Sequence, residues 1–161
     1  MPTELTNYKE IEYELRRREH EDPLGLTYKP HAMQQQCHRD RHSTLLVVGG
    51  NRSGKTWFAV AEALYYCLGR AVWADVPRPC IVWYVMPSLP MFRRTVLPVF
   101  RKLCPRKELV TFSERKGVAR FKNGSELHFL SADMKQRRLQ GASIDSAIMD
   151  ETPDETVFEE L

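Results

Sequence analysis

Residues 49–56 read Gly-Gly-Asn-Arg-Ser-Gly-Lys-Thr, an order that fits the pattern G-x-x-x-x-G-K-[ST]. Glycines let successive backbone N–H groups point inward at phosphate oxygens, and a helix that starts there adds the positive end of its dipole. Lys55 would supply a cation for the β- and γ-phosphates, and the Thr56 hydroxyl would ligate Mg²⁺. The residues predicted to contact a bound nucleotide here are Gly49, Gly50, Asn51, Arg52, Ser53, Gly54, Lys55 and Thr56.

Two alternatives stay open for this loop. A glycine-rich turn can carry a Lys-Thr pair by coincidence and bind no phosphate. Arg52, inside the loop, either adds a second cation against the γ-phosphate or points into solvent. The predicted neighbours favour phosphate binding, because the motif requires a strand before the loop and a helix after it.

A second set of reactive side chains lies where an apolar run ends in two carboxylates, Asp150 and Glu151. In a nucleotide hydrolase the first carboxylate of such a pair holds the magnesium shell, directly or through water bound to Thr56. The second acts as a general base, or orients the attacking water, in line with the γ-phosphate. An ordinary acidic loop is the alternative. The predicted catalytic residues are Glu151, Lys55 and Arg52, and the predicted metal ligands are Thr56 and Asp150.

The elements that must position these residues follow from the hydrophobic pattern. Short apolar runs predict buried strands, and apolar residues at spacings of three and four predict helices. Asn123-Gly124 is a strong hairpin signal, and Pro98 predicts a kink in its helix. The expected helices cover 4–22, 31–39, 55–68 and 90–104, and the expected strands cover 44–48, 80–86, 109–112, 118–121, 126–130 and 146–149.

Strands that alternate with helices predict an α/β fold with a mostly parallel sheet flanked by helices. The hairpin adds an antiparallel β-hairpin insertion. Because the carboxyl ends of parallel strands meet at one edge of such a sheet, the carboxylates and the phosphate loop are expected to lie together. The fold class predicted from these elements is a P-loop NTPase of the ASCE type.

The length and composition of the chain argue against several classes of protein. The chain has 161 residues, one domain's worth, with 42% hydrophobic and 28% charged residues, which argues against a disordered tail, a collagen or a coiled coil. The longest uncharged apolar-rich run, 79–92, is shorter than the ~20 residues that span a bilayer. The N-terminus has no apolar segment of a secretory signal. Four cysteines without a CxxC pair argue against a zinc site or a disulfide framework.

Charge is unevenly distributed, although the net charge is only +3. Residues 91–122 carry ten basic and two acidic side chains, whereas residues 145–161 carry seven acids and no base. A basic stretch of this kind suits a polyanion, and a solvated surface with segregated signs is the alternative. Seven residues apart on a helix, Arg94 and Arg101 would share one face and could contact a duplex backbone without reading its sequence.

Four segments together resemble the ATPase domain of large terminase subunits, the genome-packaging motors of tailed bacteriophages. They are the loop 49–56 and residues 123–129, 137–145 and 150–153, and the resemblance spans 28–161. The family's loop commonly carries an arginine, as at Arg52. Residues 30–34 resemble the family's adenine-contacting segment, in which Gln34 is the match and Gln35 or Gln36 are alternatives.

This resemblance implies ATP and Mg²⁺ as ligands and double-stranded DNA, contacted through its backbone, as a partner. It also implies a portal protein, a small terminase subunit, a homo-oligomeric ring and action in the cytoplasm of the bacterial host, without a membrane. The expected division is an N-terminal helical extension over 1–27 and an incomplete P-loop ATPase domain over 28–161, without the nuclease domain. We expect this chain alone to fold poorly or to hydrolyse ATP slowly.

The arginine finger of such motors, which stabilises the transition state, has more than one candidate here. Arg52 is one, and Arg137 or Arg138 is another, with phosphate-backbone contact or solvation as the alternative for the latter two. Two other functions remain open. One is a different P-loop helicase or translocase, and the other is a non-catalytic nucleotide-binding fragment, which a turnover assay would distinguish.

Overall fold

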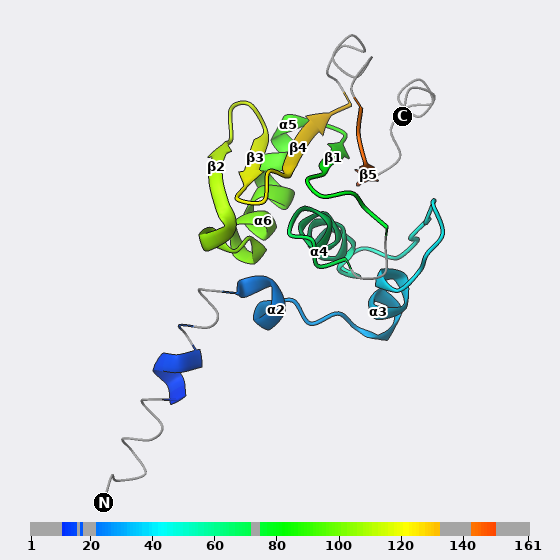
Figure 1. Cartoon of the computed structure of the whole chain (residues 1–161). Coiled ribbons are helices and arrows are strands. Elements are labelled where there is room, and N and C mark those ends of the chain that lie inside the picture. The colour runs from blue at the N-terminus through cyan, green and yellow to red at the C-terminus, as the bar shows by residue number, and fades with distance from the viewer. Residues whose placement is uncertain (1–10, 16, 18–21, 72–74, 133–142, 151–161) are drawn as a thin grey trace, which may run out of the picture.

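The computed structural model of the chain describes residues 11–15, 17, 22–71, 75–132 and 143–150. They form a five-stranded mixed sheet in the order β2-β3-β4-β1-β5, with helices packed against one face (Figure 1). The strands are β1 (Ile81–Met86), β2 (Leu109–Ser113), β3 (Val118–Phe121), β4 (Glu126–Ser131) and β5 (Ser146–Met149). In these positions the predicted strands are confirmed.

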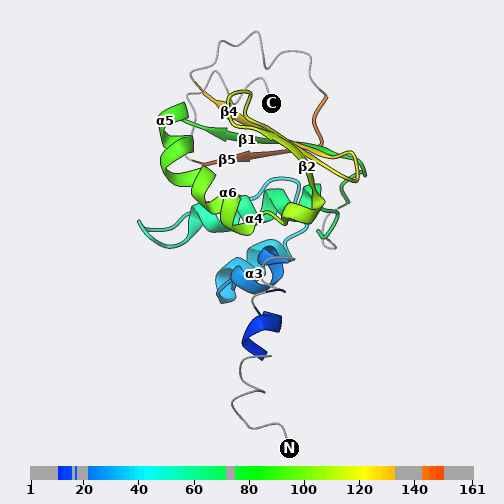
Figure 2. The ribbon, with the colours of Figure 1, turned by 90° about the vertical axis from the view of Figure 1, so that its left-hand side faces the viewer.

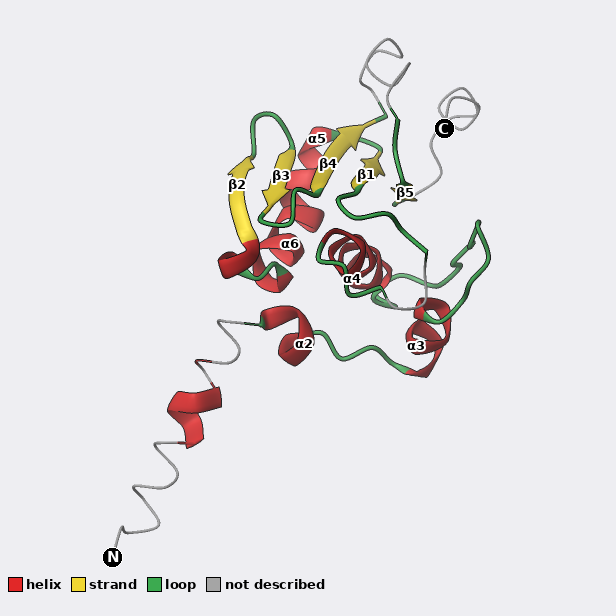
Figure 3. Ribbon diagram, in the orientation of Figure 1, coloured by secondary structure: helices red, strands yellow, loops and turns green. Residues whose placement is uncertain are grey.

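The pairing explains why the sheet is mixed. β1 pairs in parallel with β4 on one side and with β5 on the other. β3 pairs antiparallel with both β4 and β2. The predicted α/β fold, with its parallel centre and hairpin insertion, is therefore confirmed (Figure 3).

The hairpin turn between β3 and β4 forms at Asn123-Gly124, as predicted. Gly124 has a φ of 88°, a left-handed conformation that favours glycine. The Asn123 side chain accepts a hydrogen bond from the Ser125 N–H (3.0 Å) and donates one to the carbonyl of Cys67 (2.7 Å). The turn thereby fixes the hairpin to the end of the main helix.

The helices form two layers below the sheet. α4 and α6 lie directly beneath it, and α3 lies beyond α4 (Figure 2). The bounds are α2 (Pro23–Thr27), α3 (Ala32–His38), α4 (Lys55–Cys67), α5 (Leu89–Met91), the π-helix η1 (Phe92–Val96), α6 (Leu97–Leu103) and the 3₁₀-helix η2 (Arg106–Glu108). No helix among the described residues is long and apolar enough to cross a membrane.

The predicted helix over 90–104 forms with an irregularity before Pro98. Proline lacks an N–H group and its ring clashes with the carbonyl four residues earlier, so it disturbs the preceding turn. Here the disturbance takes the form of a π-turn in η1. Arg93 and Arg101 consequently meet at one carboxylate, that of Glu114, at 3.5 and 2.9 Å. That Arg94 shares a face with Arg101 and contacts a duplex stays a prediction.

The predicted strand over 44–48 is wrong, since these residues are neither helix nor strand. The described part of the sheet ends at β5, and residues 44–48 pair with none of its strands. A backbone that pairs with no strand must keep its N–H and C=O groups in contact with water. Leu46 and Val48 are accordingly 81% and 84% exposed. The apolar run that suggested burial therefore lies on the surface, directly before the glycine-rich loop.

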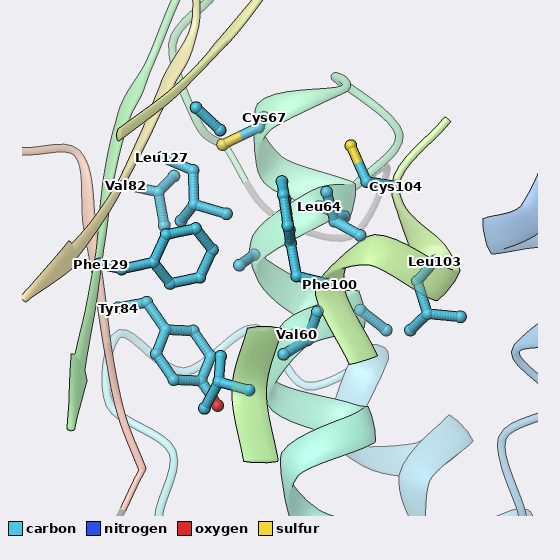
Figure 4. Close-up of a cluster of buried hydrophobic side chains, with 14 of the residues drawn as sticks. Val60, Leu64, Cys67, Val82, Tyr84, Phe100, Leu103, Cys104, Leu127 and Phe129 are labelled. Carbon is cyan, nitrogen blue, oxygen red and sulfur yellow. The ribbon is translucent and has the colours of Figure 1, made fainter. Parts of the chain in front are cut away.

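The core lies between the helices and the sheet. Val60 and Leu64 of α4 face Val82 of β1 and Leu127 and Phe129 of β4 (Figure 4). Such burial of apolar area is the main driving force for packing α4 on the sheet. It fixes the direction of α4, and hence the place where its first turn meets the ends of the strands.

Candidate nucleotide-binding site

The glycine-rich loop leads directly into α4, as the motif requires. Gly54 is the N-cap of α4 with a φ of 84°, and a Cβ there would lie 2.9 Å from Nε2 of Gln34. The positive φ favours glycine, whereas the Gln34 side chain could move away from a Cβ. Within the described part of the chain, the N–H groups of Lys55 and Thr56 have no hydrogen-bond acceptor. These groups and the helix dipole form the kind of anion site that a phosphate occupies.

Lys55 folds back over the loop that precedes it. Its ammonium group donates to the carbonyls of Gly49 (2.6 Å) and Gly50 (2.9 Å). The loop itself is closed by a bond from the Ser53 N–H to the Gly50 carbonyl (3.3 Å). Arg52 has a φ of 64°, a conformation that costs a non-glycine residue free energy, and its side chain is exposed.

The predicted metal ligands, 94 residues apart in sequence, are neighbours in space. The Thr56 hydroxyl donates to Oδ2 of Asp150 at 3.3 Å. Thr56 lies in the first turn of α4, and Asp150 follows directly on β5, with its N–H bonded to the carbonyl of Val85. Hydroxyl and carboxylate oxygens are the ligands that Mg²⁺ prefers, so this pair fits the metal that the motif implies.

A further contact to the same carboxylate was not predicted from the sequence. The Tyr84 hydroxyl donates to Oδ2 of Asp150 at 2.8 Å. Burial and the neighbouring Asp150 carboxylate raise the pKa of Tyr84 well above its ordinary value, so the phenol stays protonated and acts as a donor. The signal in the sequence is a single hydroxyl within an otherwise apolar buried strand, beside the acidic strand end.

Gln34, which the resemblance matches to an adenine-contacting segment, reaches the phosphate loop from α3. Its Nε2 donates to the carbonyl of Gly54 (3.2 Å), and its Oε1 accepts from the His31 N–H at the start of α3 (3.1 Å). Gln35 instead donates to the carbonyl of Pro30 (2.9 Å). Of the three glutamines, Gln34 is therefore the one in contact with the loop, and its amide already holds two hydrogen bonds.

A buried polar cluster holds α3 against α4. The Tyr28 hydroxyl and Nε2 of His38 form a 2.9 Å hydrogen bond, and Nδ1 of the same ring bonds to the carboxylate of Glu62 in α4. His38 and Glu62 are 4% and 9% exposed. Desolvation raises the pKa of Tyr28, which keeps its phenol protonated. Because Gln34 and His38 share one short helix, this cluster also sets the distance of Gln34 from the loop.

Other predicted site residues lie outside the described residues. These are Glu151, Arg137 and Arg138. Among the described residues no group of three or more His, Cys, Asp or Glu side chains could hold a metal ion. Both predicted metal ligands, Thr56 and Asp150, lie within the described part, and a metal ion held there would take its remaining ligands from phosphate and water.

The basic segment 91–122 is exposed at every one of its ten cationic positions. Glu114 pairs with Arg93 and Arg101, and Arg120 pairs with Glu126 at 2.8 Å. Lys102 lies over the ring of Trp57, 5.2 Å from its centroid. The segment runs through η1, α6, η2, β2 and β3, and β2 is the edge strand opposite β5 (Figure 1).

Comparison with known proteins finds a family model that matches most of the chain. The family model described as "Terminase large subunit, T4likevirus-type, N-terminal" matches residues 46–161. This chain belongs to that terminase family. The match begins just before the glycine-rich loop and includes every strand of the sheet. Comparison with curated proteins finds no match.

Two solved structures have the same fold. The large terminase ATPase domain of Thermus phage P74-26 is 24% identical, with a TM-score of 0.59, over 78% of this chain and 55% of that chain. A large terminase from a thermophilic bacteriophage is 16% identical, with a TM-score of 0.58, over 82% of this chain and 36% of that chain. The terminase chain described here therefore spans about half or less of these relatives.

Proposed function

We propose that this chain is the ATP-binding and ATP-hydrolysing motor part of a large terminase subunit. In this proposal it drives double-stranded DNA into a viral procapsid in the cytoplasm of the bacterial host. The observation that carries it is the 3.3 Å contact between Thr56, at the start of the loop helix, and Asp150, at the end of β5. Membership of the terminase family favours packaging over a helicase-like role for the same chemistry.

For nucleotide binding we assign the phosphates to residues 49–56. Lys55 would exchange its two carbonyl partners in the loop for phosphate oxygens, a stronger charge-assisted contact. Gln34, already against Gly54, is the first candidate to contact adenine, and Gln36 is exposed beside it. An adenine contact through Gln34 requires that one of its present hydrogen bonds be given up.

For the metal we assign Thr56 and Asp150. Bound Mg²⁺ would supply positive charge that neutralises the charge developing on the phosphates. The hydroxyl of Thr56 and the carboxylate of Asp150 would hold it, directly or through water. The 3.3 Å hydrogen bond between these two groups supports their assignment to one site.

For hydrolysis we assign Glu151, the residue directly after Asp150. Its carboxylate would accept a proton from the attacking water, or orient that water in line with the γ-phosphate. Arg52, exposed within the loop, would stabilise the transition-state charge, in this subunit or in its neighbour in a ring. Arg137 and Arg138 remain the other candidates for that role.

For the partners we assign DNA to the basic segment 91–122. Its exposed cations, without base-reading geometry, suit the phosphate backbone of a duplex. A portal protein, a small terminase subunit and further copies of the chain in a ring complete the proposed motor. The proposed division is a helical extension over 1–27 and a P-loop ATPase domain over 28–161.

The decisive experiment is phosphate release by the full-length terminase subunit that contains this chain, as wild type and as Glu151→Gln. The amide keeps the size of the side chain but cannot accept a proton from water. We expect ATP to bind normally and turnover to fall by about 10²- to 10⁴-fold. The matched control is Glu108→Gln, which removes one carboxylate from η2 and should leave turnover at the wild-type rate.

Two outcomes would contradict the proposal. If Glu151→Gln turned over ATP at the wild-type rate, another carboxylate would have to act as the catalytic group. Asp150 and Asp154 would be the next candidates. ATP binding without any turnover in the wild-type protein, with DNA present or absent, would favour a non-catalytic nucleotide-binding module.

A further inference from the structure

We propose that Tyr84 is a positioning residue for the Mg²⁺ site: its hydroxyl holds the Asp150 carboxylate in the orientation that Thr56 and the metal require. The inference rests on the proposed Mg²⁺–ATP site at Thr56 and Asp150. It adds a residue that lies outside the loop and the acidic strand end, on the neighbouring strand β1.

The first support is the geometry at a single oxygen atom. Oδ2 of Asp150 accepts hydrogen bonds from both Tyr84 (2.8 Å) and Thr56 (3.3 Å). Two donors from two different elements fix the plane of a carboxylate far better than one. Oδ1 has no donor in the described part of the chain and stays available to a metal or its water shell.

The second support is the register of the strands. Tyr84 pairs with Ile148 across β1 and β5, and the Asp150 N–H bonds to the carbonyl of Val85. Side chains alternate along a strand, so Ile148 and Asp150 face the same side of the sheet as Tyr84. That side is the one covered by α4, whose first turn carries Thr56.

The third support is the rigidity of the tyrosine itself. Tyr84 is 0% exposed, and its ring packs against Phe129 at a centroid distance of 5.8 Å (Figure 4). A ring held by core packing cannot follow a carboxylate that turns away. Groups that hydrogen-bond a metal ligand in this way set its orientation, and their loss typically weakens metal binding by 10- to 100-fold.

The experiment compares Tyr84→Phe with wild type in the full-length subunit. Phenylalanine keeps the ring and its packing and removes only the hydroxyl. Binding of a fluorescent ATP analogue is titrated with Mg²⁺, and the Mg²⁺ concentration at half-maximal effect is measured. We expect it to rise by roughly 10-fold or more, while binding of the analogue without Mg²⁺ stays at the wild-type level.

Two further variants separate this inference from the proposed function on which it rests. They are Asp150→Asn and the double variant Tyr84→Phe/Asp150→Asn. If Asp150→Asn leaves the Mg²⁺ dependence unchanged, the proposed metal site itself is wrong. If Asp150→Asn raises the Mg²⁺ concentration at half-maximal effect but Tyr84→Phe does not, only the role of Tyr84 is overturned. If Tyr84 acts through Asp150, Tyr84→Phe adds little in the Asp150→Asn background, whereas equal effects in both backgrounds would contradict the inference.

The control is Tyr13→Phe, the same substitution at a position that is 71% exposed. It should leave the Mg²⁺ concentration at half-maximal effect unchanged. An increase equal to that in Tyr84→Phe would indicate a general structural effect. Should Tyr84→Phe fail to fold, 3-fluorotyrosine placed at residue 84 gives a second measurement. Its ¹⁹F resonance should move when Mg²⁺ joins the nucleotide complex, and an unmoved resonance would overturn the inference.

Discussion

Lys55 carries the charge that a bound phosphate would need most. Its ammonium group lies over the loop, held by the carbonyls of Gly49 and Gly50. Lys55→Ala removes the cation and leaves the backbone cradle in place. We expect ATP affinity to fall roughly 10- to 150-fold, since a hydrogen bond to a charged group contributes about 1.5–3 kcal/mol. Isothermal titration of ATP into both proteins measures this.

The matched control is Lys116→Ala, which removes an exposed lysine from the turn between β2 and β3. Affinity for ATP should then stay at the wild-type value. Unchanged affinity in Lys55→Ala, or equal losses in both variants, would refute phosphate binding by the loop.

At the scale of elements, α3 depends on the buried cluster formed by Tyr28, His38 and Glu62. α3 has only seven residues, too short to be stable by itself, so its place is set by tertiary contacts. His38→Leu leaves the Glu62 carboxylate buried without its histidine partner. We expect the free energy of unfolding to fall by about 3 kcal/mol, measured by urea denaturation.

The double variant His38→Leu/Glu62→Leu should recover part of that loss, because it removes the buried carboxyl group as well. The control is His42→Leu, which removes an exposed histidine that is also paired with a carboxylate, that of Asp40. It should leave the free energy of unfolding near the wild-type value. A loss in His42→Leu as large as that in His38→Leu would contradict this account of how α3 is anchored.

At the scale of the whole molecule, the basic segment extends from the first turn of α4 to the edge of the sheet opposite β5. Lys102 lies over the ring of Trp57, the residue after Thr56, whereas the segment ends in β2 and β3. A polyanion bound by the cations of β2 and β3 would not compete with ATP for Lys55. A conformational change at the proposed nucleotide site would have to reach the basic segment through the sheet and α4.

Charge removal on the basic segment gives a prediction at this scale. Arg94 and Arg106 are exposed and form no ion pair within the described part of the chain. Arg94→Gln/Arg106→Gln should weaken duplex binding and flatten its dependence on salt. Each lost phosphate contact removes about 0.9 from the slope of log K against log salt. Fluorescence anisotropy of a labelled duplex across a salt series measures the slope.

Arg39→Gln/Arg41→Gln is the control, with the same change of net charge at exposed positions after α3. Its salt slope should match that of the wild type. Equal slopes in all three proteins would show that the basic segment is a solvated surface, and equal flattening in both variants would show a response to net charge alone.

Patterns in the sequence predict those features of this protein that depend on neighbouring residues. The spacing of glycines, Lys55 and Thr56 identified the loop, because these residue types are needed within one turn of chain. Hydrophobic periodicity located α4, and Asn123-Gly124 located the hairpin, since both follow local conformational preferences. The resemblance to terminases followed from the order of such local segments.

Strand pairing and contacts between distant residues become known from the tertiary structure alone. The run 44–48 has the composition of a buried strand, yet it pairs with no strand of the described sheet and remains exposed. Pro98 predicts an irregular turn, and the structure shows that this irregularity is a π-turn. Tyr84 looked like a core residue, and only the register of β1 against β5 brings its hydroxyl to Asp150. Pairing and register arise from contacts between segments far apart in the chain, which local patterns do not encode.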